Sequence, residues 1–225
     1  MQIVVLTGAG ISAESGLGTF RDESGLWTQY DLQEVATPEG FAGNPDLVNA
    51  FYNARRANAA GASPNAAHEA LARLGRQEGC DLTLITQNVD DLHERSGSRD
   101  VIHMHGRLGG ALCASCDHRW EAPMEMQAAD PCPACAAPAT LPDVVWFGEV
   151  PYHMDRIMQA VSSADLFVAI GTSAAVYPAA GLVELAPSDT LEINLAPSDR
   201  ANAFQNHIYG PASDVVPTWV AGLDL

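Results

Sequence analysis

The segment "IVVLTGAGISA", residues 3–13, decides the fold class. An apolar run at residues 3–6 leads within one residue into Gly8, Gly10 and Ala13. The spacing G-x-G-x-x-A directly after a strand is typical of a tight turn that brings a helix N-terminus up to a pyrophosphate. The segment therefore predicts a nucleotide-binding α/β fold.

Further apolar runs extend this prediction along the chain. Strand-like runs lie at residues 3–6, 82–85, 166–170 and 191–195, and helical segments are expected at 46–59, 64–77, 153–162 and 179–185. The helix at 64–77 is expected to start from Ser63 as N-cap with Pro64 in its first turn. Such alternation predicts a Rossmann-like parallel sheet with helices on both faces.

The loop after the glycine turn differs from that of a dehydrogenase. A long helix should follow Ala13, with an acid at the end of the next strand about 20 residues on. Instead Gly16, Gly18 and Gly25 interrupt the sequence, and the loop carries Phe20, Arg21 and Trp27. A Gly-rich surface turn is the simpler alternative. We favour nucleotide binding, because loops of this length usually have a function.

Four cysteines form the pattern C-x2-C-x15-C-x2-C: Cys113, Cys116, Cys132 and Cys135. Two such pairs can supply four thiolates to one zinc ion, which closes the coordination shell and makes the ion structural. A pair of disulfides is the alternative. The segment 107–143 is rich in Cys, Pro and Ala, which indicates an insertion. Cys80 is expected to be a small buried hydrophobic residue.

Charge and composition exclude other classes of protein. The chain has 225 residues with 28 acidic and 11 basic residues, all of the latter Arg, and a net charge of -17. This balance argues against nucleic acid as a partner, because nucleic-acid-binding proteins carry a basic face. Neither an apolar run of about 20 residues nor a secretory signal is present, so we expect no membrane contact and a cytoplasmic location.

A polar cluster follows the second strand. Gln87, Asn88 and Asp90 come directly after residues 82–85, and "VIHMHG" then supplies His103 and His105. Ligands of open α/β sheets bind at the carboxyl ends of the strands, where this cluster is expected to lie. The spacing alone does not indicate which histidine takes part in chemistry.

With these motifs the chain resembles the sirtuins, which are NAD-dependent protein lysine deacylases. The motifs GAGIS, TFR, TQNVD, HMHG, the paired CxxC, VVWFGE, GTS and a late Asn194 occur in the family's order over essentially the whole chain. One departure is Gly18, where the family commonly has Pro.

The resemblance implies roles for individual residues. His105 would be the catalytic base with Asn88 as a second catalytic residue, and His103 a structural neighbour. NAD would be bound by Gly8, Ala9, Gly10, Ile11, Ser12, Phe20, Arg21, Trp27, Gln87, Asn88, Val89, Asp90, Gly171, Thr172, Ser173, Asn194, Leu195, Ala196 and Ala212.

The resemblance also implies a reaction. The carbonyl oxygen of an acyl-lysine attacks C1′ of NAD as nicotinamide leaves, and a neutral His105 removes a proton from the ribose hydroxyls. The ordinary pKa of imidazole, about 6.5, suits that role. The activated 2′-hydroxyl attacks the acyl carbon, and water finally releases free lysine and O-acyl-ADP-ribose, so that NAD is consumed.

The acyl group is indicated by "FYNARR". Tyr52 and Arg55 share one face of a helix; by themselves they would be an aromatic residue packed inward and a solvated Arg. The resemblance identifies them with the class III pattern, in which they receive the distal carboxylate of succinyl- or malonyl-lysine. Ala36 would leave room for the longer acyl group, and acetyl-lysine is also expected as a substrate. The segment "VVWFGEVP" is expected to be a short apolar strand ending at a turn, and the substrate backbone would pair with Val145, Phe147, Gly148 and Glu149.

The expected organisation is one catalytic domain, residues 1–225, acting on acyl-lysine proteins as a monomer. Its larger lobe would comprise residues 1–28, 68–106 and 144–225, and its smaller lobe the helical residues 29–67 and the zinc ribbon 107–143. Two alternatives remain: a non-catalytic module that binds NAD or ADP-ribose, and a mono-ADP-ribosyltransferase.

Overall fold

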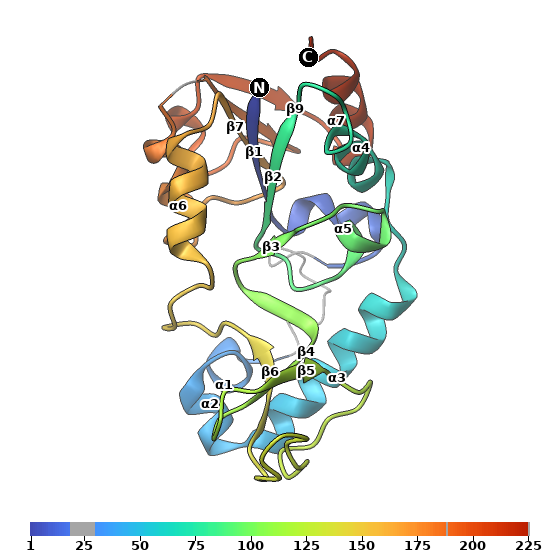
Figure 1. Cartoon of the computed structure of the whole chain (residues 1–225), viewed down its shortest axis with the longest axis vertical. Coiled ribbons are helices and arrows are strands. Elements are labelled where there is room, and N and C mark those ends of the chain that lie inside the picture. The colour runs from blue at the N-terminus through green and yellow to red at the C-terminus, as the bar shows by residue number, and fades with distance from the viewer. Residues whose placement is uncertain (19–29, 188, 225) are drawn as a thin grey trace.

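The larger of two sheets contains six parallel strands (Figure 1). A computed structural model describes residues 1–18, 30–187 and 189–224. The strand order is β3-β2-β1-β7-β8-β9, with β1 (Gln2–Thr7), β2 (Asp81–Thr86), β3 (Ile102–His103), β7 (Leu166–Ile170), β8 (Asp189–Asn194) and β9 (Asn206–Tyr209). The predicted parallel sheet is therefore confirmed.

Helices cover both faces of this sheet. Ile3 and Val5 point toward α4 (Ala66–Leu74) and α7 (Ala212–Ala221). Val4 and Leu6 point toward α6 (Met154–Ser162) and the 3₁₀ helix η4 (Ala179–Leu185) on the opposite face. Because both faces are covered, successive residues of β1 are apolar, which explains why its sequence is a continuous apolar run.

The strand order reverses beside β1. The chain passes from β1 to β2 and β3 on one side, then returns to place β7 on the other side of β1. In open α/β sheets such a reversal leaves a crevice at the carboxyl ends of the two strands. Thr7 and Ile170 are paired at that end, so the glycine turn of residues 8–10 lies at the mouth of the crevice.

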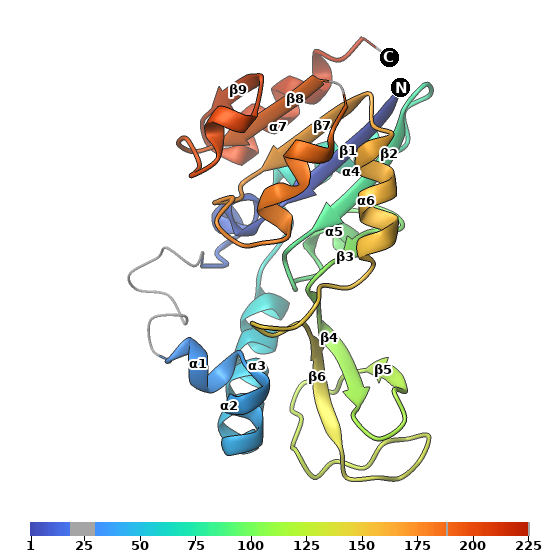
Figure 2. The same cartoon turned by 90° about the vertical axis from the view of Figure 1, so that its left-hand side faces the viewer.

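A smaller antiparallel sheet and a helical segment lie at the other end of the molecule (Figure 2). The sheet order is β5-β4-β6, with β4 (Gly106–Cys113), β5 (Arg119–Glu121) and β6 (Thr140–Val144). The helices are α1 (Leu32–Val35), α2 (Pro38–Gly43) and α3 (Pro45–Gly61). Phe51, Tyr52 and Val48 of α3 share a buried cluster with Leu108, Val144 and Trp146, so α3 packs against this sheet.

Some predicted boundaries are wrong. The helix expected at 64–77 is shorter, because Asn65 rather than Ser63 is its N-cap. The side chain of Asn65 accepts a hydrogen bond from the N–H of Ala67, and His68 accepts one from the N–H of Asn65 at 3.3 Å. Asn is as good an N-cap as Ser, and this reciprocal pair decides between them.

Other differences concern short elements. Only Val144 of the predicted "VVWFGEVP" strand lies in β6, because the chain leaves the sheet there. The sequence did not predict β3, β9, α5 (Leu92–Arg95) or α7, which contains Pro217, and it gave no bounds for α1 and α2 within the residues 29–67 expected to be helical. None of the helices in the described ranges combines the length and apolar character needed to cross a membrane.

Candidate functional site

The glycine turn meets the end of β7 at very close range. The N–H of Gly8 donates to Ile170 O at 2.9 Å, and that of Gly10 donates to Gly171 O at 2.8 Å. A Cβ on Gly10 would lie 2.7 Å from Cα of Gly171, and one on Gly171 would lie 2.5 Å from N of Ile11. Glycine is thus required on both sides of the crevice, and the backbone itself forms its mouth.

In the described residues 8–18, the segment contains only short 3₁₀ turns, η1 (Ala9–Ile11) and η2 (Ala13–Ser15). Gly16 follows with φ +85°, in the left-handed region that ends a helix. The interruption that Gly16 predicted is therefore present. The predicted ligand residues Phe20, Arg21 and Trp27 lie outside the described residues.

A chain of hydrogen bonds joins the polar cluster after β2 to this turn. Nδ2 of Asn88 donates to Gly8 O at 3.2 Å and to Oγ of Ser12 at 3.1 Å. Ser12 in turn donates to Oδ2 of Asp90 at 3.1 Å. Burial raises the pKa of Asp90, against the lowering effect of its hydrogen bonds to Leu92 and Ser12. The structure thus brings Asn88, Ser12 and Asp90 together.

Residues that follow β7 and β8 form the other side of the crevice. Gln87 Nε2 donates to Oγ1 of Thr172 at 3.0 Å, which ties the end of β2 to the end of β7. Nδ2 of Asn194 donates to Thr172 O at 2.8 Å. Three strand ends therefore converge on Thr172, next to Gly171 and Ser173. Leu195 and Ala196 are exposed, and Ala212 begins α7.

The two histidines of HMHG have different partners. Nδ1 of His105 lies 3.0 Å from Gln87 O. Because a carbonyl only accepts, Nδ1 carries the proton and Nε2 keeps its lone pair. Burial lowers the pKa of His105, although the hydrogen bond to Gln87 opposes this. His105 is therefore neutral at pH 7, which a general base requires.

His103 has both ring nitrogens engaged. Its Nδ1 lies 3.2 Å from Asn88 O, and its Nε2 lies 2.6 Å from Oε1 of Glu94. Neither nitrogen is left for a substrate. Both contacts of the ring are thus with groups of the chain itself.

Two buried histidines under the turn were missed by sequence reasoning. Nε2 of His68 lies 3.4 Å from Oγ of Ser12, and Nε2 of His93 lies 3.0 Å from Oγ1 of Thr7. The two rings are 4.9 Å apart. Burial lowers the pKa of His68 to about 4 and that of His93 well below its usual range. Both are neutral groups packed beneath the turn, and neither had a sequence signal that identified it.

Tyr52 and Arg55 lie together on α3. Cζ of Arg55 lies 5.6 Å from the ring centroid of Tyr52, whose hydroxyl accepts a hydrogen bond from Nε1 of Trp146 at 3.1 Å. Burial raises the pKa of Tyr52 and lowers that of Arg55. The charges of Tyr52 and Asp90 raise the pKa of Arg55 and so oppose the effect of burial. The guanidinium therefore lies within electrostatic range of Asp90 in the polar cluster.

The segment after β6, residues 145–149, contacts both His105 and Ala36. The N–H of Val145 donates to His105 O, and that of Phe147 donates to Ala36 O, both at 2.9 Å. Glu149 accepts from the N–H of Trp146 at 2.7 Å, which closes the turn around Gly148. Ala36 is buried, whereas 43% of Phe147 is exposed. The segment thus borders His105 on one side and Ala36 on the other.

The four cysteine sulfurs lie within 4.8 Å of one another. Cys113 and Cys135 are 3.7 Å apart at their sulfurs, and Cys116 and Cys132 are 3.8 Å apart. Disulfide sulfurs would be about 2.05 Å apart, so the disulfide alternative is wrong. Tetrahedral Zn–S bonds of about 2.3 Å place sulfurs roughly 3.8 Å apart. The geometry fits a closed tetrathiolate zinc site.

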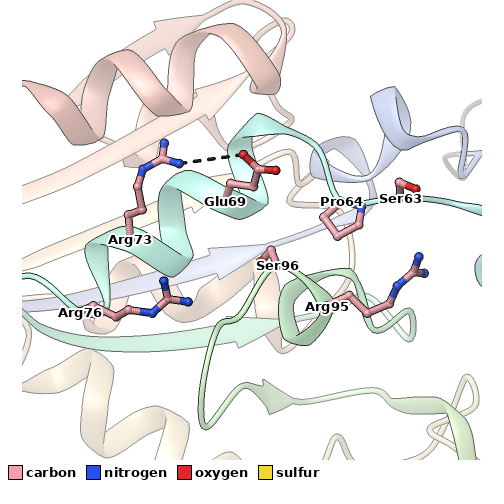
Figure 3. A pocket seen from close by; sticks show the side chains of 7 residues that line it. All are labelled: Ser63, Pro64, Glu69, Arg73, Arg76, Arg95 and Ser96. Carbon is pink, nitrogen blue, oxygen red and sulfur yellow. Dashed lines mark ion pairs between the residues drawn. The ribbon is translucent and has the colours of Figure 1, made fainter.

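A separate groove of about 480 Å³ lies beside α4 and α5 (Figure 3). Its three arginines are held by groups of the chain itself. Arg73 pairs with Glu69, Arg76 donates to Gly97 O, and Arg95 donates to Ala62 O. The groove contains none of the predicted site residues.

The fold and the site define a class: a nucleotide-binding α/β protein with a tetrathiolate ribbon. The model of the Sir2 family matches residues 8–178. A relative from Caulobacter vibrioides is 58% identical over 230 residues, which span 99% of this chain and 97% of that protein. Another, from Salmonella typhimurium, is 52% identical over 225 residues, which span 97% of this chain and 82% of that protein. Both are named NAD-dependent protein deacylase.

Solved structures of Sir2 homologues are also similar to this chain. A Sir2 homologue bound to NAD has a TM-score of 0.89 and 41% identity, with coverage of 97% of this chain and 88% of that one. A mutant Sir2 homologue bound to ADP ribose has a TM-score of 0.90 and 41% identity, with coverage of 97% and 90%. The chain belongs to the Sir2 family, which confirms the resemblance to sirtuins.

Proposed function

We propose that this protein is an NAD-dependent protein lysine deacylase that removes succinyl and malonyl groups and also acetyl groups. The observation that carries the proposal is that one segment, residues 145–149, contacts both groups: the N–H of Val145 donates to the backbone O of His105, and Nε1 of Trp146 donates to the hydroxyl of Tyr52, which lies beside Arg55. His105 supplies a base, and Arg55 and Tyr52 supply a cation and a hydroxyl for an acidic acyl chain.

NAD fits the crevice at the ends of β1 and β7. Backbone atoms of Gly8, Gly10 and Gly171 approach one another at its mouth, where an added Cβ would meet the opposing backbone. A glycine turn of this kind after a parallel strand is the arrangement that binds a pyrophosphate. Asn88 is held between Gly8 O and Ser12, which fixes the direction of its carboxamide. When bound, NAD supplies an ADP-ribosyl group with nicotinamide as leaving group, and the acyl group leaves lysine as O-acyl-ADP-ribose.

His105 is oriented for proton removal. The carbonyl of Gln87 holds Nδ1–H, and Nε2 is the basic atom. Its backbone carbonyl accepts a hydrogen bond from Val145 at 2.9 Å, so the base is fixed to the segment proposed to pair with the substrate backbone. We therefore assign Nε2 the removal of a ribose hydroxyl proton, with Asn88 orienting the same ribose.

Arg55 gives the acyl preference. Its side chain lies over the rings of Phe51 and Tyr52, at 5.5 and 5.6 Å from their centroids. A guanidinium held in this way can bind a carboxylate in a bidentate, charge-assisted pair. Tyr52 adds a hydroxyl donor, while its oxygen accepts from Trp146.

Matched peptides that differ only in the acyl group on one lysine test the proposal. Mass spectrometry with NAD should show loss of succinyl, malonyl and acetyl groups. Arg55→Met should lower kcat/KM for the succinyl peptide by up to about 100-fold, the scale of a lost charge-assisted hydrogen bond, and change that for the acetyl peptide little. Arg73→Met, on the exposed side of α4, is the matched control.

The results separate the alternatives. Equal losses on both peptides in Arg55→Met would contradict the acyl assignment. A non-catalytic NAD or ADP-ribose module would release no nicotinamide, and a mono-ADP-ribosyltransferase would leave the ADP-ribose on protein.

We also propose that the protein acts as a monomer in the cytoplasm, on acyl-lysine proteins. Sedimentation equilibrium and fractionation of cells that express the protein measure these two properties. A stable dimer, or recovery with membranes, would contradict them.

A further inference from the structure

Helix α3 has two functional faces, offset by one residue. Tyr52 and Arg55 form the face toward the proposed acyl site. Asn53 and Arg56 occupy the next positions at the same spacing, and both contact the zinc ribbon region. Residues i and i+3 lie on the same side of a helix, one turn apart. Because Arg55 and Arg56 are adjacent on one rigid helix, the contacts of Arg56 also affect how α3 presents Arg55.

Arg56 is a buried cation with neutral partners. It is 5% exposed. Nε donates to Leu108 O at 2.8 Å, and Nη1 donates to Oδ1 of Asn53 at 2.7 Å and to Met124 O at 3.2 Å. Nη2 lies 3.2 Å from Sδ of Met126. Among the residues that the structure describes, no carboxylate forms an ion pair with Arg56. Burying a charge without an ionic partner costs free energy. The planar guanidinium offsets this cost because its several donors can bond to different acceptors at once.

One partner connects Arg56 to the polar cluster. While the carbonyl of Leu108 accepts from Arg56, its N–H donates to Val89 O at 2.7 Å. Val89 lies between Asn88 and Asp90, and β4, which contains Leu108, begins at Gly106 directly after His105. A single residue, Leu108, thus connects Arg56 of α3 to the loop that carries Asn88 and Asp90.

The other partners belong to the loop between the two cysteine pairs. Asn53 donates from Nδ2 to Met126 O at 3.0 Å and accepts at Oδ1 from the N–H of Met126 at 2.9 Å. Arg56 adds its bond to Met124 O. Asn53 and Arg56 therefore fix this loop to α3, so that the ribbon forms part of the support for α3.

We propose that Arg56 is a positioning residue that sets the distance between the acyl-carboxylate face of α3 and His105. The inference rests on the proposed preference for acidic acyl groups. A succinyl chain must meet Arg55 at one end and the reacting atoms at the other, so it depends on that distance. An acetyl group has no distal carboxylate and does not depend on it.

The test is Arg56→Lys, which keeps the charge and loses the fork. Kinetics on matched succinyl and acetyl peptides should show a KM for the succinyl peptide raised about tenfold, less than the roughly 100-fold that a 1 Å misplacement can cost. The KM for the acetyl peptide should stay within about twofold on the same reasoning. Zinc content should remain one ion per chain. Arg107→Lys, which alters an exposed pair with Glu121 in the same region, should change neither KM.

Asn53→Ala is the second variant if Arg56→Lys fails to fold. It removes the two bonds to Met126 and the bond from Nη1 of Arg56, and it leaves the contacts of Arg56 with Leu108 O, Met124 O and Sδ of Met126 in place. It should shift the succinyl KM in the same direction. Equal changes in both KM values, or none, with zinc retained would overturn the inference while leaving the proposed function intact. A wild-type protein that does not distinguish succinyl from acetyl peptides would overturn the proposed acyl preference and the inference that rests on it.

Discussion

Gly171→Ala tests the contact on which the nucleotide crevice depends. Gly171 has φ +62°, and an added Cβ would lie 2.5 Å from N of Ile11 and 2.7 Å from C of Gly10. Both neighbours are backbone atoms of the glycine turn, so neither can move without opening the mouth of the crevice. The substitution should therefore weaken both folding and nucleotide binding.

The magnitude follows from two separable costs. A Cβ in the left-handed region costs about 1–2 kcal/mol, and overpacking adds about 1–3 kcal/mol. Gly16→Ala isolates the first cost, because Gly16 has φ +85° and no atom within 4 Å of its added Cβ. Gly61→Ala, which also meets nothing within 4 Å and has no positive φ, should leave stability almost unchanged.

Urea denaturation followed by circular dichroism measures the free energy of unfolding of the three variants. Gly171→Ala should lose about 1–3 kcal/mol more than Gly16→Ala, and titration calorimetry should show a weaker affinity for NAD in Gly171→Ala than in Gly61→Ala. Equal losses at Gly171 and Gly16, with unchanged NAD affinity, would refute the account of the crevice.

Three further predictions concern pH, the metal and the base. Burial lowers the pKa of His68 to about 4, so between about pH 6.5 and pH 4 the unfolded chain binds a proton that the folded chain does not. His68 should thus contribute roughly 3 kcal/mol to the fall in the free energy of unfolding as the pH falls through that window, beside the contribution of His93, whose pKa is also lowered, and His68→Asn should reduce this dependence; an unchanged slope in the variant would contradict it. Removal of zinc by a chelator, or Cys113→Ser, should lower the melting temperature and release one zinc per chain by atomic absorption, whereas a chain that never contains zinc would contradict the tetrathiolate site. Because burial lowers the pKa of His105, kcat/KM should stay on its plateau below about pH 6.5 and decline only in more acidic buffer; a decline that begins well above pH 7 would assign the base to another group.

The glycine turn could be predicted because its signal is local. An apolar run, two glycines and an early break at Gly16 are all readable within 16 residues of the N-terminus. The four-cysteine site was equally local, because each pair has a fixed spacing. By contrast β3 has two residues, too few for any period, and Pro217 interrupts the pattern of α7.

Other features depend on contacts that no local pattern contains. His68 and His93 meet under the turn only because α4 and α5 pack together. Arg56 reads in sequence like a second solvated Arg after Arg55, yet it is buried because the loop between the cysteine pairs folds over it. The burial of such residues cannot be predicted from local sequence, because it depends on contacts between segments that are distant along the chain.

The most direct test of the proposed function is acyl-peptide-dependent release of nicotinamide. With a succinyl-lysine peptide and NAD, each free lysine should appear together with one nicotinamide and one O-succinyl-ADP-ribose in the same chromatogram. His105→Ala should abolish turnover while peptide binding, measured by calorimetry, is largely retained. Nicotinamide release without acyl-peptide, ADP-ribose left on protein, or full turnover by His105→Ala would contradict the account.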